Sequence, residues 1–247
     1  MIAKGDIEAI ERATLAGLGC DPVAESAGWL MPMVPAPMGR AKSAVPTRHD
    51  RSIHPGQADA IIAAYRTAGL DPIFRMPDAA GHAQTRNLLA GMGFSPSLRP
   101  TLVMVADLDA VAQLTQAPAN FETAPDEGWG AVFAGPGFDP VEGQARVRVL
   151  ASARNTQFGQ VELDGQAAAV GVGNFNHGWV SIHGMRTAQS ARGRGYAAAI
   201  LAGLARIGLD RGFTRAVLQV EEGNWSALNL YRRAGFRTAW RYDYWKV

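Results

Sequence analysis

Strand-like and helix-like segments alternate along the second half of this chain, and that order is the strongest limit on its fold. Two strands are predicted at residues 156–163 and 166–175, because Asp164-Gly165 between them is a hairpin turn in which both positions tolerate positive φ. The other predicted elements of this half are a short strand near 121, a helix at 144–153, a strand at 179–187, a helix at 194–210, a strand at 215–221, a helix at 225–234 and a strand at 240–245. This alternation predicts an α/β fold with a mixed sheet flanked by helices, rather than a helical bundle or a β-sandwich.

The first half also alternates between helices and strands. Its predicted elements are a helix at 4–18, an extended region at 24–34, a helix at 57–67, a strand at 72–76, a helix at 83–92 and a strand at 99–106. Residues 88–94 and 230–236 both have the pattern of a helix end, a glycine stop and an aromatic residue that begins the next strand. This likeness suggests an internal duplication, although a helix that ends in Gly-Phe is a common pattern. With residues 114–119 as the linker, we predict two units, 1–115 and 119–247.

The composition is that of an ordinary globular protein. Of the 247 residues, 47% are hydrophobic and 19% are charged, which excludes a disordered or collagen-like chain. No apolar run approaches the roughly 20 residues of a membrane span, and Asp6 and Glu8 interrupt the stretch where a signal peptide needs apolar residues. We therefore expect a cytoplasmic protein with no membrane partner.

Few side chains are suited to metal or nucleic-acid binding. The single cysteine, Cys20, is interpreted as a buried structural thiol because no motif places a histidine or carboxylate beside it. The five histidines lack metal-ligand spacing. The formal net charge is +2, without a concentrated patch of Lys and Arg interleaved with aromatic residues. We predict no metal and no nucleic-acid partner.

The segment Arg192–Ala197, with the sequence RGRGYA, follows a predicted strand and opens a predicted helix. Glycines let the backbone approach a phosphate closely, and the N–H groups at a helix N-terminus favour a negative ligand. Gly193, Gly195 and Ala198 also satisfy the G-x-G-x-x-A pattern of dinucleotide-binding proteins. That reading needs the glycines directly after a buried strand, whereas residues 187–191 intervene here. A plain glycine-rich turn without a ligand is the other alternative.

Two motifs in this region resemble those of the GNAT superfamily of acyl-CoA-dependent N-acyltransferases. Arg192, Gly195 and Ala197 occupy the fixed positions of the superfamily pattern Q/R-x-x-G-x-G/A. Downstream, the family-like pattern N-x-x-A-x-x-x-Y-x-x-x-G-F is matched by Asn224, Ala227, Tyr231, Gly235 and Phe236. The resemblance implies a mixed, mostly antiparallel GNAT-type sheet, with acetyl-CoA or another short acyl-CoA as co-substrate and no metal.

The resemblance also implies which residues bind the cofactor. Backbone N–H groups between Gly193 and Ala197 would hold the pyrophosphate, and the backbone of Met185–Thr187 would bond the pantetheine arm and polarise the thioester carbonyl. The complete predicted cofactor-binding set is Met185, Arg186, Thr187, Arg192, Gly193, Arg194, Gly195, Tyr196, Ala197, Asn224, Ala227 and Tyr231.

Two residues are candidates for catalysis. By resemblance, Tyr231 would protonate the departing thiolate as a general acid, although a helix tyrosine can also simply pack in the core. His183 is the candidate base for the acceptor amine, since a regular strand points it to the same face as Ser181. The alternatives for His183 are a hydrogen-bonded structural role, replacement by Glu221 or Glu222, or a water chain with no dedicated base.

The first half departs from the family pattern. It has no Q/R-x-x-G-x-G/A match, and Leu89 stands where Tyr231 would be counted back from the glycine stop. We predict that residues 1–115 form a degenerate GNAT-like domain without a cofactor motif. Its basic turn at residues 39–43, with the sequence GRAKS, either touches substrate or is a solvated loop.

Together these features predict an N-acetyltransferase, monomeric or homodimeric, that acts on a small-molecule or peptide amine. A non-catalytic acyl-CoA-binding sensor or scaffold is the main alternative, because binding motifs can persist after chemistry is lost. The sequence does not identify the amine.

Overall fold

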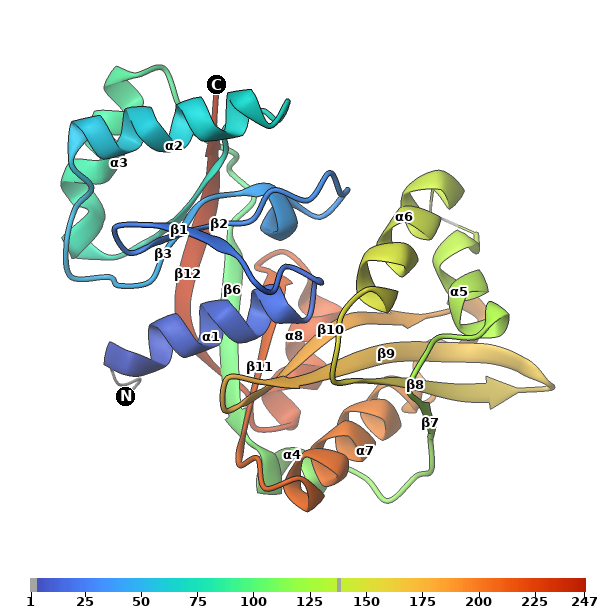
Figure 1. Cartoon of the computed structure of the whole chain (residues 1–247). Helices are drawn as coiled ribbons and strands as arrows, with labels where there is room; N and C mark the ends of the chain where they lie inside the picture. Colours follow the sequence, from blue (N-terminus) through green and yellow to red (C-terminus); the bar gives the residue numbers. More distant parts are fainter. Residues whose placement is uncertain (1–3, 137–138) are drawn as a thin grey trace.

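The computed structural model describes residues 4–136 and 139–247 (Figure 1). The α-helices are α1 (Lys4–Ala16), α2 (Pro55–Thr67), α3 (Ala83–Gly91), α4 (Leu108–Ala112), α5 (Glu127–Ala134), α6 (Pro140–Ala151), α7 (Tyr196–Asp210) and α8 (Trp225–Arg233). Three short 3-10 helices among the described residues are η1 (Gly39–Lys42), η2 (Ala80–His82) and η3 (Gln189–Ala191). The strands are β1 (Ala24–Ser26), β2 (Trp29–Met31), β3 (Val45–Pro46), β4 (Phe74–Pro77), β5 (Ser95–Pro96), β6 (Thr101–Asp107), β7 (Asn120–Glu122), β8 (Thr156–Leu163), β9 (Gln166–Asn176), β10 (Trp179–Thr187), β11 (Arg215–Glu221) and β12 (Arg237–Lys246).

The described residues form one large sheet and one small sheet. The large sheet has nine strands in the order β4-β12-β6-β11-β10-β9-β8-β7, with β5 paired to β12, and the small one is β1-β2-β3. Within the large sheet β10 and β11 run parallel, and the other pairs are antiparallel. The predicted fold class, a mixed and mostly antiparallel sheet flanked by helices, is therefore confirmed.

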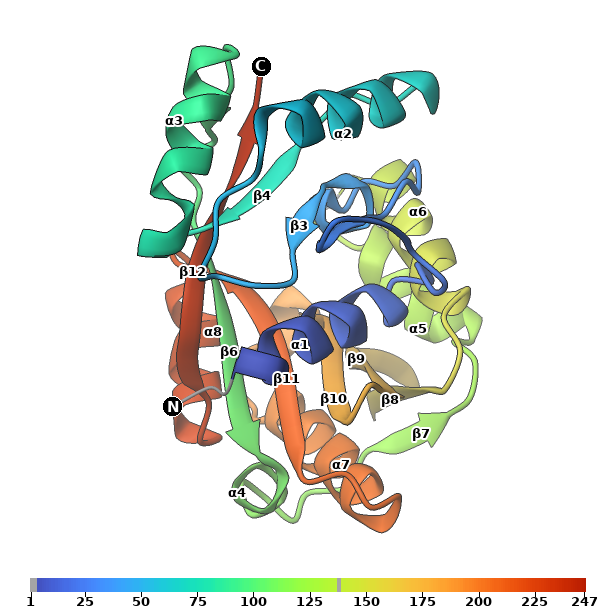
Figure 2. The ribbon, with the colours of Figure 1, turned by 60° about the vertical axis from the view of Figure 1, so that its left-hand side comes forward.

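The strand β6 comes from the first half of the chain but lies between two strands of the second half. It pairs with β11 from Thr101 to Asp107 and with β12 from Thr101 to Val105. In Figure 2 the two neighbours of β6 flank it in the middle of the sheet. The predicted division into units 1–115 and 119–247 stays a prediction, and the strands on its two sides share one sheet.

Helices cover both faces of that sheet. On β6, Met104 belongs to the buried cluster formed with α7 and α8, whereas Val103 and Val105 belong to the cluster formed with α1. This follows from the alternation of side chains along a strand. Figures 1 and 2 show α1 and α7 on opposite sides of β10. The functional residues on β10 and β11 are thus positioned between packed layers.

Local signals explain where the element predictions succeed and fail. The hairpin turn is confirmed, because Asp164 and Gly165 have φ values of 52° and 75°. The helix α5 was not predicted, since its sequence EGWGAVFA contains two glycines. It forms because the Asp126 carboxylate accepts a hydrogen bond from the N–H of Trp129, and because the Trp129 side chain is buried.

Candidate functional site

The glycine-rich turn lies between η3 and α7. Gly193 and Gly195 have φ values of 79° and 82°, and Gly195 is the N-cap residue of α7. A Cβ atom at Gly195 would meet nothing within 4 Å, so the positive φ and not crowding requires glycine here. The helical hydrogen bonds begin with the N–H groups of Ala198 and Ala199, which donate to the Gly195 carbonyl. The first-turn N–H groups ahead of them are those that a helix leaves for an anion.

A cavity of about 830 Å³, the turn cavity, opens beside this turn. It is lined by Met185, Arg186, Thr187, Ala191, Arg192, Gly193, Gly195, Tyr196, Ala197, Ala198, Asn224, Ser226, Ala227, Asn229, Leu230, Tyr231 and Arg233. Every predicted cofactor-binding residue except Arg194 is in this lining. Arg194 is exposed and lies outside this lining.

The sequence motifs leave part of the α8 wall of the turn cavity unassigned. Ser226, Asn229, Leu230 and Arg233 line it from α8. Their spacing of three and four residues puts them on one face of the helix. This periodicity is visible in the sequence and would have identified Arg233 as a further cation beside the cavity.

The strands β10 and β11 separate beside the cavity. Their paired residues run from Val180 opposite Ala216 to Ile182 opposite Leu218, and β10 then continues to Thr187 without further pairing to β11 among the described residues. The pairing of β10 with β9 is also irregular between His183 and Arg186. The two strands therefore diverge beyond Ile182, where Met185 and Thr187 of β10 line the turn cavity.

Asn224 has a structural role that its motif position did not indicate. It is the N-cap of α8, and its Oδ1 atom accepts a hydrogen bond of 3.2 Å from the N–H of Ala227. This cap uses one lone pair of the side-chain carbonyl and leaves the two amide N–H groups of Asn224 to donate to a ligand.

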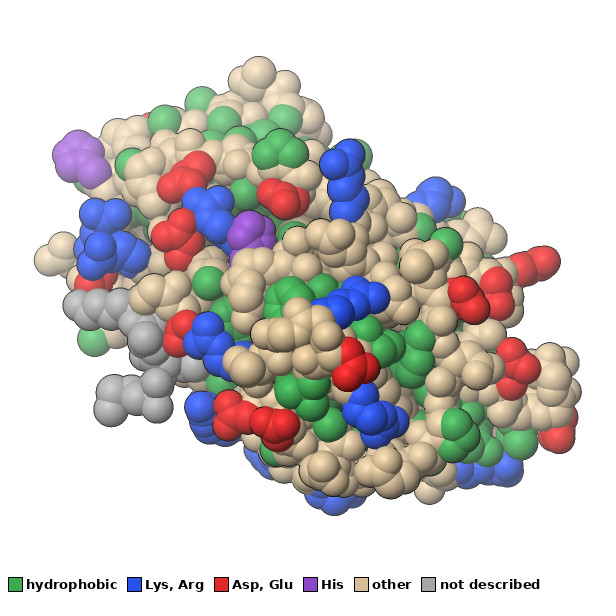
Figure 3. Space-filling model, turned by 60° about the horizontal axis from the view of Figure 1, so that its bottom comes forward, with side chains coloured by type: hydrophobic (Ala, Val, Ile, Leu, Met, Phe, Trp, Pro, Cys, Tyr) green, Lys and Arg blue, Asp and Glu red, His purple; other side chains and the backbone are tan. Residues whose placement is uncertain are grey.

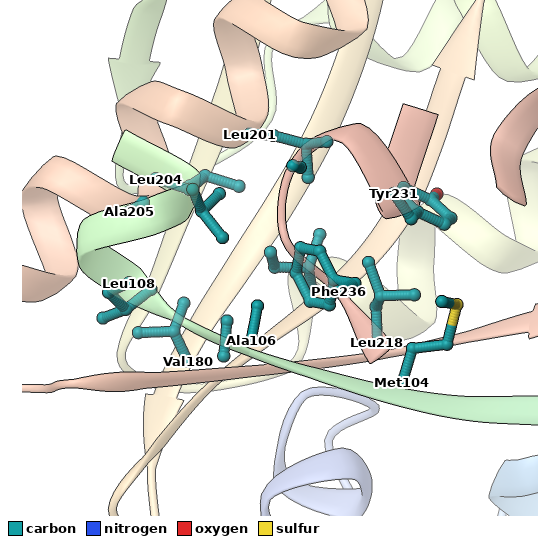
Figure 4. Packing of buried hydrophobic residues seen from close by; sticks show 14 of the residues in the cluster. Met104, Ala106, Leu108, Val180, Leu201, Leu204, Ala205, Leu218, Tyr231 and Phe236 are labelled. Carbon is teal, nitrogen blue, oxygen red and sulfur yellow. The ribbon is translucent and has the colours of Figure 1, made fainter. Parts of the chain in front are cut away.

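Tyr231 lies at the edge of the main core cluster. Its ring packs edge-on against Phe236 at 5.9 Å between centroids, and the residue is 7% exposed. Figure 4 shows its hydroxyl pointing away from Phe236 and Leu218. Burial raises the pKa of the phenol to about 12, while the positive charge of Arg40 opposes the shift. The phenol therefore keeps its proton at neutral pH and can donate it.

A second cavity of about 480 Å³, the arginine cavity, lies on the other side of Tyr231. It is lined by Leu18, Pro37, Met38, Gly39, Arg40, Thr101, Phe133, Arg146, Leu150, Ile182, His183, Gly184, Met185, Arg186, Leu218, Gln219, Val220, Glu221, Asn224, Tyr231, Tyr242 and Tyr244. The two cavities share Met185, Arg186, Asn224 and Tyr231. They meet at these four residues.

His183 lies in the wall of the arginine cavity. Ser181 donates its hydroxyl hydrogen to the Ala13 carbonyl at 2.9 Å, so the His183 Nε2 atom, 3.0 Å from the Ser181 Oγ, must be the donor in that contact. The lone pair of the ring is then on Nδ1. Burial, helped by the charge of Arg40, lowers the pKa of His183 to about 3. The imidazole is neutral at physiological pH.

The two alternative bases lie in different environments. Glu221 lines the arginine cavity. Glu222 lies outside that lining and accepts a hydrogen bond of 3.3 Å from the Arg241 guanidinium. Of the two carboxylates, only Glu221 is placed to meet a molecule in the cavity.

A buried polar network supports the floor of the arginine cavity. Arg75 forms an ion pair with Glu11, and both side chains are almost completely buried. The Gln219 Oε1 atom accepts hydrogen bonds from Arg75 at 3.3 Å and from the Tyr242 hydroxyl at 2.8 Å. Breaking a pair of this kind leaves a buried charge without a partner, so the network fixes the floor in one arrangement.

A basic surface patch and a cluster of metal ligands would mark two other kinds of site. Figure 3 shows acidic and basic side chains interspersed over one face of the molecule, without a continuous basic patch. Across residues 4–136 and 139–247, no group of three or more His, Cys, Asp or Glu side chains is arranged to hold a metal ion. Within the same residues, each helix is too short or too polar to cross a membrane.

Comparisons with known proteins concern the fold of the whole chain. The model of a family described as "Probable histone acetyltransferase Rv0428c C-terminal" matches residues 4–245. No curated protein sequence matches the chain at a significant level.

Similar solved structures share the fold over nearly the whole chain. A GCN5-related N-acetyltransferase from Kribbella flavida has a TM-score of 0.71 at 16% identity, covering 99% of this chain and 96% of its own. A tandem GNAT protein from the clavulanic acid biosynthesis pathway has a TM-score of 0.59 at 15% identity, covering 100% and 96%. A GCN5-related N-acetyltransferase from Sphaerobacter thermophilus has a TM-score of 0.53 at 16% identity, covering 100% and 93%.

Proposed function

This chain belongs to the family described as "Probable histone acetyltransferase Rv0428c C-terminal" and has a GNAT fold, and from that premise we propose that it transfers an acetyl or other short acyl group from CoA to a primary amine. The observation that carries the proposal is the meeting of the two cavities at Met185, Arg186, Asn224 and Tyr231. A two-substrate transfer needs two binding spaces that join at the reacting atoms.

The turn cavity fits acyl-CoA. Its volume of about 830 Å³ lies within the range of small-molecule sites, and the Gly193–Ala197 turn offers N–H groups to the pyrophosphate. Arg192 and Arg233 add positive charge in the same lining. When bound there, acyl-CoA supplies an activated thioester carbonyl.

The protein's own groups then act around the carbonyl carbon. Backbone N–H groups freed by the separation of β10 from β11 would hydrogen-bond to the carbonyl oxygen as negative charge builds on it. The amine attacks directly, with no covalent acyl-enzyme. Tyr231 would give its phenolic proton to the sulfur as the carbon–sulfur bond breaks, for which a raised pKa that keeps the proton in place is suitable.

His183 is the proposed acceptor of the amine proton. Its Nδ1 atom carries the lone pair, but its lowered pKa makes it a weak base that would pass a proton on rather than keep it. Glu221, in the same cavity lining, is the alternative base.

We also propose that the first half of the chain binds no CoA and instead helps to build the arginine cavity. Leu89, the counterpart of Tyr231, is completely buried in a core cluster beside α2. Gly39 and Arg40 contribute to the cavity lining from the same half. Calorimetry should give one equivalent of acetyl-CoA per chain, and two equivalents would refute this part.

The variant Tyr231→Phe tests the proposed enzyme against a sensor. It keeps the ring and removes the proton donor, so kcat should fall by roughly 10-fold to 10³-fold while acetyl-CoA affinity changes by less than about 2-fold. The rate is read as release of CoA thiol with a panel of amines, and affinity is measured by calorimetry. Tyr65→Phe is the matched control, because Tyr65 is a buried tyrosine whose hydroxyl bonds to the Pro32 carbonyl outside both cavities. Tight acetyl-CoA binding with no amine acetylated would support the sensor instead.

A further inference from the structure

The basic turn at residues 39–43 contributes a guanidinium to the arginine cavity. Arg40 is carried by η1 and lines this cavity but not the turn cavity. Gly39 allows its placement, because a Cβ atom there would lie 2.9 Å from the Cζ atom of Tyr244. The close contact of the Gly39 backbone with the Tyr244 ring holds the turn over the cavity.

The hydrogen-bonding groups of Arg40 are only partly used by the protein. Its Nη1 atom donates a long hydrogen bond of 3.4 Å to the Gln219 Oε1 atom, which already accepts from Arg75 and Tyr242. Its Nε atom is buried and has no hydrogen-bond partner among the described residues. The protein therefore offers this guanidinium few acceptors, which favours an anionic ligand beside its other N–H groups.

Positive side chains outnumber negative ones in the lining of the arginine cavity. Three arginines and one glutamate contribute to the lining. Glu142 pairs with Arg146, and Glu11 pairs with Arg75 below the floor. Glu221, the last residue of β11, is the one carboxylate in the described lining. Because Glu11 also feels the charge of Arg40 but is already paired with Arg75, the group of charges around Arg40 keeps a net positive charge.

Arg40 also lies close to the residues proposed to act on the amine. Its charge lowers the pKa of His183 and opposes the rise in the pKa of Tyr231. A molecule that reaches from Arg40 to the junction of the cavities would be small, as a volume of about 480 Å³ also requires.

From these contacts we propose that the acceptor is a small primary amine that also carries an anionic group, of the amino-acid type, and that Arg40 binds this anion. The inference rests on the proposed acetyl transfer and names its substrate class. The planar fork of an arginine matches a carboxylate or a phosphonate with two parallel hydrogen bonds. The anion would thus fix the amine at the junction of the two cavities.

The test uses the full chain, acetyl-CoA and matched acceptors. The panel contains the common amino acids, their carboxamides, the corresponding aminoalkyl phosphonates and a lysine-rich peptide without acidic residues. For the preferred side chain, we expect kcat/KM to be at least about 10-fold higher for the anionic amine than for its carboxamide. The carboxylate and phosphonate arms decide which anion fits.

Arg40→Gln should remove this preference. Its kcat/KM for the anionic amine should fall by about 10-fold to 100-fold, mainly through KM, with acetyl-CoA affinity unchanged since Arg40 lies outside the turn cavity. Loss of the Arg40 charge also alters the surroundings of His183 and Tyr231. That effect is common to the anionic amine and its carboxamide, so it cancels in the ratio of their kcat/KM values. Lys42→Gln, on the same 3-10 helix but outside the cavity lining, is the control and should keep the preference.

Each other result would overturn the inference. Equal rates for acids and carboxamides, or an Arg40→Gln variant that slows both equally, would remove the anion site while acetyl transfer stands. A higher kcat/KM for the lysine-rich peptide would mean that the cationic cavity does not select the acceptor. Failure to acetylate any amine while acetyl-CoA binds would overturn the proposed function together with the inference.

Discussion

The turn cavity and the arginine cavity differ in how the chain builds them. The turn cavity is lined from a single stretch, residues 185–233, and much of its proposed chemistry uses backbone N–H groups. The arginine cavity takes its lining from both halves, including Leu18, Arg40, Thr101 and Phe133. A site made of consecutive turns leaves a motif in the sequence, whereas a site assembled from distant side chains does not.

This difference matches the division of labour in the proposed reaction. Pyrophosphate and pantetheine are common to every acyl-CoA, and backbone groups at the N-terminus of α7 and along β10 would bind them without needing particular side chains. Acceptor amines vary, so the groups that select them are side chains such as Arg40 and His183. The predictions below test whether the two cavities separate in this way.

The largest effect is expected for Gly195→Glu in the turn cavity. A glutamate there must adopt a φ near 82°, and its carboxylate would occupy and repel the pyrophosphate position. Acetyl-CoA affinity measured by calorimetry should fall by at least about 100-fold. Gly178→Glu is the matched control, because Gly178 has a φ of 76° and open space around it but lies in the β9–β10 turn outside both cavities.

The control separates strain from site loss. Both substitutions carry a similar backbone cost of about 1–2 kcal/mol, so both variants should lose comparable thermal stability. Equal acetyl-CoA affinity in Gly195→Glu and Gly178→Glu would contradict the assignment of the turn cavity to the cofactor. It would also remove the basis for treating the two cavities as different.

Local signals in the sequence predicted much of the fold and most of the turn cavity. Short windows predict the Asp164-Gly165 turn and the 215–221 strand, since a turn type or a short apolar run is decided locally. The residues that the motifs indicate likewise make up most of the described lining of the turn cavity.

The parts that were missed depend on contacts between distant residues. The position of β6 between β11 and β12 follows from pairings across more than a hundred residues, such as Val105 with Val217, which no periodicity encodes. Arg40 was left open between a substrate contact and a solvated loop for the same reason. Contacts between distant residues, such as that of Gly39 with Tyr244 and that of Arg40 with Gln219, place Arg40 in the cavity lining.

An intermediate effect is expected for the pH dependence of stability through His183 in the arginine cavity. Its folded pKa is lowered from 6.5 to about 3, so below pH 6.5 the unfolded chain binds more protons than the folded one. The stability it contributes is complete above pH 6.5 and is lost as the pH falls toward 3. At pH 5 the loss should be on the order of 2 kcal/mol, from 1.36 kcal/mol per pH unit.

Denaturant unfolding of the original protein and of His183→Gln, each at pH 7 and at pH 5, measures this contribution of His183 to the free energy of unfolding. The variant should lose less stability between the two pH values, by about the same 2 kcal/mol. His49 and His82, whose pKa values are also lowered by burial, are present in both proteins and cancel. If the two proteins lose equal stability between pH 7 and pH 5, water reaches His183 in the folded protein. The arginine cavity would then be as hydrated as the turn cavity.

The smallest effect is expected for Arg233→Gln, which asks whether side-chain charge adds to the backbone contacts of the turn cavity. Arg233 lines this cavity from the last turn of α8, whereas the adjacent Arg232 is equally exposed but lies outside the lining. Both residues have the same relation to the helix dipole, so Arg232→Gln controls for any general loss of charge.

Calorimetry at low salt should show acetyl-CoA affinity about 5-fold to 10-fold weaker for Arg233→Gln and nearly unchanged for Arg232→Gln. The difference should shrink at 0.5 M salt as the phosphate charges are screened. Equal losses in the two variants would show that the cofactor responds only to net charge, and that backbone N–H groups alone determine where the phosphates bind.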